Sequence, residues 1–235
     1  YQGEWQKAAD MAQNVMSSGF TLAGDYSFYG PGTPTSEEVF TIINSAADNG
    51  ITGSGGWSSF YNSASDNGRG DSPYSADLLD AYETGDKRLD NLSKFSDGAL
   101  FTTKFPDGQN GADKVPLIRV TEMYLNKAEA LAELGGVNAE SITLINALRS
   151  RAGLSAWTSG NFASADDFLD AIAHERRLEL AFEGHRRMDL LRRGKALRTS
   201  GAGAGISSPG DTYVVLPVPQ RELDVNPNLT QNAGY

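Results

Sequence analysis

Apolar side chains recur every three or four positions in several stretches of this chain, which is the spacing of an amphipathic helix. The first stretch predicts a helix over 3–18 that ends at Gly19, a residue suited to the left-handed position after a helix. A second, shorter helix is predicted over 75–84, with Ser75 as its N-cap and Gly85 after its last turn. Both predictions combine the apolar spacing with a residue that marks a helix end.

Two further stretches each predict a pair of helices. The first pair spans 118–134 and 138–152 and is separated by two consecutive glycines. The second pair spans 165–183 and 185–198 and is separated by Gly184. Most of the helical residues that the sequence predicts therefore lie between 118 and 198.

Small side chains in the first pair allow its helices to approach closely, as in a tetratricopeptide unit, and they are Ala128, Ala130 and Ala132. Two pairs in succession predict a short helical array, in which the 3–18 helix is half of another unit. Arrays of fewer than three repeats are marginally stable. We therefore expect the chain to continue upstream of Tyr1 in a longer precursor.

The pattern changes between the helices. Residues 44–74 are rich in Gly, Ser, Asn and Asp, and the segment is too long for a plain connection. Short apolar runs at 39–43 and 213–216 predict strands, and the Pro- and Asn-rich end at 214–235 predicts an extended tail. The sequence thus predicts a mainly α fold, with tetratricopeptide-like helix pairs, a loop-rich irregular region and a few short strands.

Composition excludes several kinds of function. The formal net charge of -10 argues against binding to nucleic acid, because such binding depends on a basic surface. The chain has no cysteine, which excludes disulfides and cysteine-ligated zinc. Its two histidines are His174 and His185, too far apart for a metal pair on one helical turn. No apolar run approaches the ~20 residues of a membrane span, and no signal peptide is recognisable. We expect no metal and no cofactor.

Basic residues concentrate at 174–195 although the chain is acidic, and they are Arg176, Arg177, Arg186, Arg187, Arg192, Arg193 and Lys195. On one helix, Glu175, Glu179 and Glu183 would lie one turn apart, within reach of Arg176, Arg186 and Arg187. A basic cluster that carries its own counter-charges favours a salt-bridged structural network over an anion-binding surface.

Five sequence blocks resemble those of the SusD/RagB family of outer-membrane nutrient-binding lipoproteins. The most specific is "ERRLELAFEGHRRMDLLRRGKA", beginning at Glu175. The others are "WQKAADMAQNVMSSGFTL", "LLDAYETGDKRLDN", "VPLIRVTEMYLNKAEALAELGG" with the following "INALRSRAGL", and "LPVPQRELDVNPNLTQNAGY". They occur in the family's order and extend over almost the whole chain.

This resemblance implies a domain organisation. Residues 1–235 would form the C-terminal portion of a single SusD-like domain. Within it, 1–24 would end a tetratricopeptide-like helix, 25–116 would form a loop-rich, ligand-facing region, 117–200 would hold the helix pairs, and 201–235 would be an extended tail.

The resemblance also implies a function. Members bind oligosaccharides without catalysis at the surface of Bacteroidetes-type cells and deliver them to a TonB-dependent transporter of the SusC type. They are held at the outer membrane by a lipidated cysteine, which this chain does not contain. The implied partners are therefore an oligosaccharide and a SusC-like transporter.

The candidate ligand site lies in the 44–74 segment, where the family's ligand-facing loops are located. Sugar rings stack on flat aromatic faces, and their hydroxyl groups bond to amide, carboxylate and guanidinium groups. The predicted ligand-binding residues are Trp57, Phe60, Tyr61, Asn62, Asp66, Asn67, Arg69 and Tyr74. The alternative is that Trp57 and Phe60 only pin the loop to the helical scaffold.

Other interpretations remain open at this point. A glycoside hydrolase would need two carboxyl groups across a cleft, and a helical-repeat scaffold could bind peptides instead of glycans. The RGD tripeptide at 69–71 is too common to indicate integrin binding. "SDNGRGD" lacks the ligand spacing of a calcium loop. "GAGAG" at 201–205 is a flexible connector, because no strand precedes it and no lysine follows it.

Overall fold

The computed structural model describes residues 2–49, 56–199 and 204–235. The chain divides into two compact units, Gln2–Glu183 and Gly184–Tyr235, and each is described by itself. Most of the "GAGAG" segment lies outside the described residues. The mainly α fold predicted from the sequence is confirmed.

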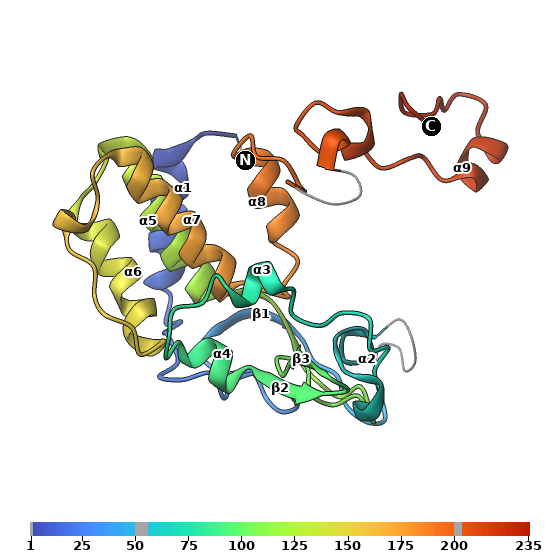
Figure 1. The fold of residues 1–235 in the computed structure, drawn as a ribbon, viewed down its shortest axis with the longest axis horizontal. Helices are drawn as coiled ribbons and strands as arrows, with labels where there is room; N and C mark the ends of the chain where they lie inside the picture. The colour runs from blue at the N-terminus through green and yellow to red at the C-terminus, as the bar shows by residue number, and fades with distance from the viewer. Residues whose placement is uncertain (1, 50–55, 200–203) are drawn as a thin grey trace. The chain divides into compact units, whose positions relative to one another are not determined.

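Four helices form the main body of the first unit: α1 (Trp5–Met16), α5 (Val120–Gly135), α6 (Ala139–Arg151) and α7 (Ala165–Glu179). Helices α1, α6 and α7 each pack against α5 (Figure 1). The predicted 3–18 helix and the first predicted pair are thereby confirmed. Asn138 caps α6 by accepting a hydrogen bond from the backbone N–H of Ser141 at 2.9 Å.

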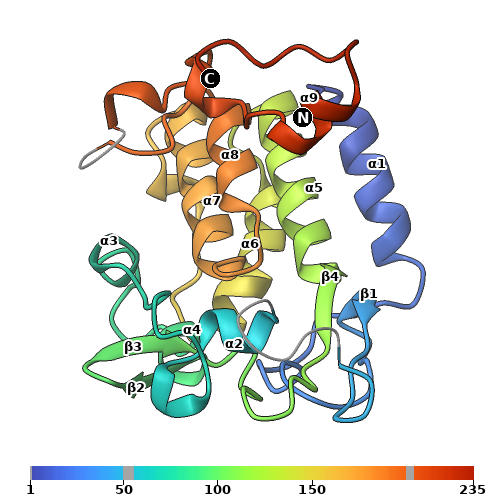
Figure 2. The ribbon, with the colours of Figure 1, turned by 90° about the vertical axis from the view of Figure 1, so that its right-hand side faces the viewer.

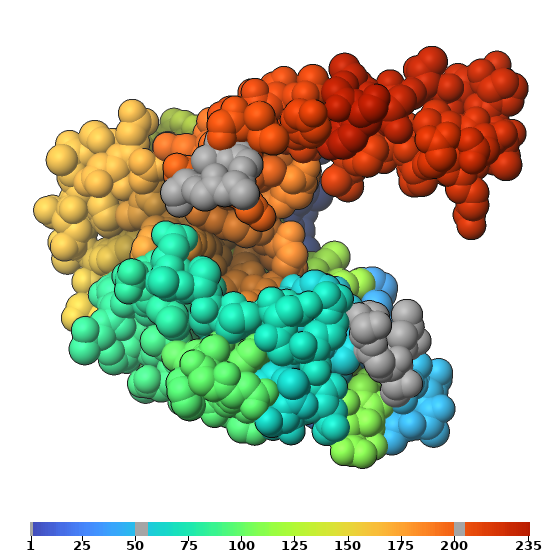
Figure 3. Space-filling view, turned by 45° about the vertical axis from the view of Figure 1, so that its right-hand side comes forward, coloured from blue at the N-terminus to red at the C-terminus, as the bar shows by residue number. Residues whose placement is uncertain are grey.

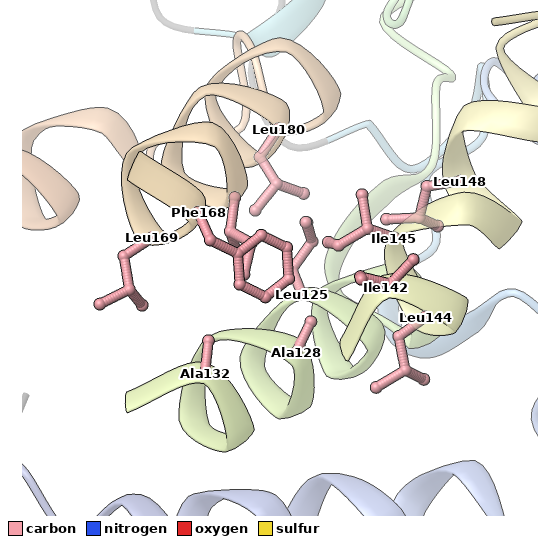
Figure 4. Close-up of a cluster of buried hydrophobic side chains, with 11 residues drawn as sticks. Leu125, Ala128, Ala132, Ile142, Leu144, Ile145, Leu148, Phe168, Leu169 and Leu180 are labelled. Atoms are coloured by element: carbon pink, nitrogen blue, oxygen red, sulfur yellow. The ribbon is translucent and has the colours of Figure 1, made fainter. Parts of the chain in front are cut away.

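The apolar core lies where α5, α6 and α7 meet (Figure 4). Small alanines on α5 leave room for large side chains from its neighbours, as the sequence indicates. The buried cluster consists of Leu125, Ala128, Ala132, Ile142, Leu144, Ile145, Leu148, Phe168, Leu169, Ile172 and Leu180. Burying a leucine or phenylalanine side chain stabilises a fold by about 2 kcal/mol, so this cluster supplies the rigid support for the rest of the unit.

The remainder of the first unit has short elements. Strand β1 (Glu38–Ile42) pairs antiparallel with β4 (Val115–Arg119), which runs directly into α5 (Figure 2). The predicted strand at 39–43 is confirmed by β1. Its Phe40 lies opposite Ile118 in the register, which is interrupted by bulges.

A hairpin that the sequence analysis missed is formed by β2 (Ser93–Ser96) and β3 (Ala99–Thr102). Its turn has positive φ at both Asp97 (49°) and Gly98 (82°). Asp-Gly is the preferred pair for such a turn, so the signal was present in the sequence.

Short helices occupy the rest of this region: α2 (Trp57–Tyr61), the 3-10 turn η1 (Ala64–Asp66), α3 (Ala76–Leu79) and α4 (Lys87–Asn91). The 3-10 turn η2 (Ser159–Asn161) lies between α6 and α7.

The predicted helix over 75–84 is too long. Ser75 does cap it, accepting a bond from the backbone of Leu78 at 3.3 Å, but α3 ends at Leu79. Beyond that point the Tyr82 hydroxyl donates to the carbonyl of Leu178, and Glu83 pairs with Arg149. These tertiary bonds replace the last predicted turn.

Helix α7 also ends earlier than predicted, at Glu179 instead of residue 183. Lys104 donates to the carbonyls of Glu179 and Ala181, both at 2.9 Å, so buried cations satisfy carbonyls at the end of the helix. Phe182 then adopts a φ of 66°, which interrupts any helix.

The second unit contains α8 (Arg186–Arg192), η3 (Ala204–Ile206), η4 (Thr212–Val214) and α9 (Gln220–Val225). Helix α8 is shorter than the predicted 185–198. The predicted strand at 213–216 is wrong, because η4 occupies its first half and its last two residues belong to no strand.

Side chains near the C-terminus replace a partner strand in the second unit. Asn232 donates to the carbonyl of Leu216 at 2.6 Å, and the Tyr235 hydroxyl donates to that of Val215 at 3.0 Å. An apolar run with these partners does not need a β ladder.

Candidate ligand site

Three aromatic side chains of the predicted site come from the short helix α2. Trp57 and Tyr61 are one turn apart, with ring centroids 5.9 Å apart, and Phe60 meets Tyr61 edge-on at 5.2 Å. Trp57 and Phe60 are each 39% exposed, whereas Tyr61 is partly buried. The helix thus presents two rings at the surface, supported by a third.

Phe105, which the sequence analysis missed, lies beneath these rings. It is 1% exposed, stacks on Tyr61 with ring centroids 5.8 Å apart, and contacts Trp57 in a tilted arrangement at 5.3 Å. We refer to Trp57, Phe60 and Tyr61, with Phe105 beneath them, as the aromatic platform. Burial raises the pKa of the Tyr61 hydroxyl, so this group stays neutral.

Close backbone contacts, one within the loop after α2 and one between that loop and the loop of Gly108, support the aromatic platform. A Cβ on Gly68 would overlap the carbonyl of Asn62, and one on Gly108 would overlap the carbonyl of Asp66. Only glycine permits such backbone approach without a shift. Asn62 donates from its amide to the carbonyl of Phe105 at 3.0 Å, which joins the loop after α2 to the loop that carries Phe105.

Two of the predicted ligand residues lie in the interior. Asn62 is 5% exposed and uses its amide in the bond to Phe105. Tyr74 is 6% exposed, its hydroxyl donates to the carbonyl of Leu92 at 3.2 Å, and its ring meets Phe182 at 4.7 Å. Direct ligand contact by Asn62 and Tyr74 does not fit this burial, because their polar groups already serve the fold.

The remaining predicted residues, Asp66, Asn67 and Arg69, lie in the segment that follows α2. Arg69 lies over the ring of Phe60, with its guanidinium carbon 4.7 Å from the ring centroid, and pairs with Asp71 at 2.5 Å. Asp66 pairs with Lys94 of the β2–β3 hairpin at 2.5 Å. Hydrogen bonds from Lys94 and Arg69 lower the pKa values of Asp66 and Asp71, so both remain ionised.

Asn67 is exposed and takes a φ of 61°. Its amide donates to the side-chain carbonyl of Gln109 at 3.4 Å, a long contact that brings two amides together near the platform. Gln109, Lys94 and Phe105 come from segments distant in the sequence, which is why no local pattern indicated them. The space-filling view shows residues 56–113, coloured teal to green, as one continuous part of the first unit's surface (Figure 3).

The pairing predicted within the arginine-rich segment at 174–195 was wrong. Glu175, Glu179 and Glu183 pair with cations from other elements instead of with their helical neighbours. Glu175 bonds to Arg88 at 2.5 Å and to Arg149 at 3.2 Å.

Glu179 is the most connected of these carboxylates. It bonds to Arg119 at 3.0 Å and to Arg151 at 2.8 Å, and Arg88 lies at 3.6 Å. Burial alone would raise its pKa, but the charges of Arg151 and Arg119 outweigh burial and hold the pKa well below its usual range. The same competition lowers the pKa of Glu183 to about 2, through Arg119 and Lys104.

Neither a metal-binding cluster nor a membrane-spanning helix occurs in the part of the chain that the structure describes. Within residues 2–49, 56–199 and 204–235, no group of three or more His, Asp or Glu side chains is arranged to hold a metal ion. In the same ranges no helix combines the length and hydropathy needed to cross a lipid bilayer. The acids of "SDNGRGD" are instead paired with Lys94 and Arg69.

Known proteins resemble this chain in sequence. "SusD-like protein P38" of Formosa agariphila is 38% identical over 125 residues, which are 51% of this chain and 24% of that protein. "Starch-binding protein SusD" of Bacteroides thetaiotaomicron is 32% identical over 127 residues, 52% of this chain and 21% of that protein. The matched part thus spans about a quarter of the length of these relatives.

A solved structure shares the fold. A "putative sugar binding protein" of Bacteroides vulgatus superimposes with a TM-score of 0.80 at 27% identity, covering 100% of this chain and 56% of that protein. The sequence profile described as "SusD family" matches residues 40–235. That match includes the aromatic platform, the buried ion-pair network and the second unit, and the chain therefore belongs to the SusD family.

Proposed function

We propose that this protein binds oligosaccharides at the cell surface and does not hydrolyse them. The observation that carries the proposal is the pair of half-exposed rings, Trp57 and Phe60, on one short helix above buried Phe105. Region 25–116, which contains them, is proposed as the ligand-facing part of the protein. The relative named as a starch-binding protein supports this class of ligand.

Stacking supplies an affinity of useful size. Covering an exposed indole face with one sugar ring removes apolar area from water, worth on the order of 1–2 kcal/mol at about 25 cal/mol per Å². Two rings and a few bonds to Asn67, Gln109 or Arg69 would give a dissociation constant of roughly micromolar to millimolar. Such weak binding suits a receptor that must release its ligand to another protein.

The charges near the platform do not suit a glycoside hydrolase. That mechanism needs a carboxylic acid with a raised pKa beside a second carboxylate. Asp66 and Asp71 instead have lowered pKa values because each is paired with a cation. Burial raises the pKa of Asp113 to about 6, but this residue is only 1% exposed and cannot reach a sugar on the surface.

Delivery and location form the finer part of the proposal. We propose that the full-length protein is an outer-membrane lipoprotein, exposed at the surface, that passes its ligand to a TonB-dependent SusC-like transporter. Purification of the full-length protein from its native membrane, followed by identification of co-purifying β-barrel proteins, tests this assignment. Recovery in the soluble fraction without such a partner would contradict it.

A binding experiment tests the central proposal. The full-length protein is titrated calorimetrically with a panel of oligosaccharides, and each mixture is then analysed for shortened products. We expect heat of binding with at least one glycan and no products. Product formation would support a hydrolase instead, and binding to a peptide pool without binding to any glycan would support a peptide receptor.

A further inference from the structure

We infer that the aromatic platform selects neutral glycans over glycans that carry carboxylate or sulfate groups. This inference rests on the proposed function and adds the charge class of its ligand. It depends on how the cations around the platform are paired and on the net charge of the surrounding segment.

The exposed cations near the platform are already neutralised. Arg69 gives both Nε and Nη2 to the same oxygen of Asp71, at 3.0 and 2.5 Å. Lys94 gives its ammonium group to Asp66 at 2.5 Å. An anionic sugar that approached either cation would have to share it with the carboxylate already bound there, which weakens the attraction that the cation can offer.

Lys104, a buried cation of the same region, already has its own partners. Lys104 is 2% exposed and contacts Glu183 at 2.5 Å as well as two backbone carbonyls. It therefore cannot turn toward a surface ligand without breaking its bonds to Glu183 and to the carbonyls of Glu179 and Ala181, which would leave those two buried carbonyls without this donor.

The surrounding charge adds a repulsive term. Residues 56–113 contain ten acidic and five basic residues, a net charge of -5, within a chain of net charge -10. A carboxylate or sulfate approaching this surface meets like charge over distances comparable with the Debye length, about 8–10 Å in physiological salt. A neutral sugar experiences neither this repulsion nor the cost of breaking an ion pair.

The polar groups left available fit hydroxyl groups. The exposed Asn67 amide and its neighbour Gln109 offer both donors and acceptors, and their mutual contact at 3.4 Å is long enough to be exchanged readily. The rings of Trp57 and Phe60 offer apolar faces to sugar C–H groups. Aromatic rings that stack on sugars and amides that bond to hydroxyl groups together form a site suited to uncharged hexoses or pentoses.

Matched glycans test the inference. Each neutral hexose oligosaccharide of the panel is compared with the same oligosaccharide oxidised at C6 to its uronate, so that chain length and linkage stay constant. We expect the oxidised form to bind at least tenfold more weakly at low salt, with the difference shrinking as salt screens the repulsion. Equal or tighter binding of the oxidised form would overturn the inference and leave the proposed function intact. Binding of neither form would overturn both.

A substitution tests the role assigned to the pair Arg69–Asp71. Asp71→Asn releases the guanidinium, and we expect it to raise affinity for the oxidised glycan several-fold. The matched control is Asp77→Asn, which also removes one exposed carboxylate, but one paired with Arg177 of α7. Equal gains in both variants would show that net charge alone discriminates, and no gain in Asp71→Asn would show that Arg69 plays no part.

Discussion

Arg119 and Glu183 form a buried, two-pronged ion pair although they lie 64 positions apart in the sequence: Nε donates to Oε2 at 2.8 Å, and Nη2 donates to Oε1 at 3.1 Å. Arg119 is the last residue of β4, and Glu183 follows α7. The pair therefore fastens the end of α7 to the start of α5. Lys104 joins the same carboxylate, linking it to the loop that begins with Phe105.

The first prediction concerns acid stability. The pKa of the Glu183 carboxyl group is about 2, compared with an ordinary value of 4.5. The folded state therefore binds the carboxyl proton of Glu183 less tightly than the unfolded chain does. The lowered pKa of Glu183 contributes up to about 3 kcal/mol to the free energy of unfolding. This contribution is present above pH 4.5 and is lost as the pH falls toward 2. Urea denaturation between pH 7 and pH 3 measures it.

Glu183→Gln should flatten this pH dependence while lowering stability at pH 7. Glu140→Gln serves as the control, because Glu140 makes an exposed pair with Lys127. If the free energy of unfolding of Glu183→Gln falls with decreasing pH as steeply as that of the unmodified protein, other carboxylates cause the loss of stability in acid.

The second prediction concerns Glu179. Glu179→Ala removes one of the two buried carboxylates that Arg119 and Arg151 share, the other being Glu37, and should lower the free energy of unfolding by about 3–5 kcal/mol. Glu140→Ala should change it by less than about 1 kcal/mol. Glycan affinity of the folded Glu179→Ala fraction should equal that of the unmodified protein. Normal unfolding combined with lost binding would contradict the structural role.

The third prediction concerns Trp57. Trp57→Ala removes one exposed face of the aromatic platform and should weaken glycan binding about tenfold, equivalent to about 1.4 kcal/mol. Phe95→Ala is the control, since Phe95 of β2 is 70% exposed and lies outside the platform. Calorimetric titration of the full-length variants gives both affinities. If Trp57→Ala binds as tightly as the unmodified protein, Trp57 only packs against Phe105 and the site lies elsewhere.

The fourth prediction concerns Asp113, which is 1% exposed and leaves its Oδ1 atom without a hydrogen-bond partner. Burial raises its pKa to about 6 from 3.8, although the bond from the backbone N–H of Asp107 opposes the shift. The folded state binds the carboxyl proton of Asp113 more tightly than the unfolded chain does. The protonated Asp113 side chain therefore makes its full contribution to the free energy of unfolding below pH 3.8, and this contribution disappears as the pH rises through about 6.

Asp113→Asn removes this charge and keeps one oxygen to accept the Asp107 N–H. It should raise the free energy of unfolding at pH 8 by about 2 kcal/mol, with a smaller gain at pH 5. Thermal unfolding at several pH values measures the difference. A loss of stability that does not vary with pH would show that the carboxylate is needed for its shape and not for its charge.

Local sequence patterns determined the helices that pack on one another and the class of the fold. The spacing of apolar residues located α1, α5 and α6 to within about two residues, because a helix that buries one face must repeat that face every three to four positions. The family blocks identified the SusD family, and aromatic residues in a polar segment indicated Trp57 and Phe60 as surface rings.

Only the tertiary structure decided which charges pair and which polar residues remain at the surface. Spacing along one helix suggested that Glu179 would pair with its helical neighbours, but a deeply buried carboxylate takes cations from every element around it, here Arg119 of β4 and Arg151 of α6. Asn62 and Tyr74 are residue types that often bind sugars, yet both are buried and form hydrogen bonds to the distant carbonyls of Phe105 and Leu92. Phe105 contacts Tyr61 and Trp57 although it lies 44 or more positions away in the sequence. The periodicity of a single helix or strand cannot predict a contact between segments so far apart.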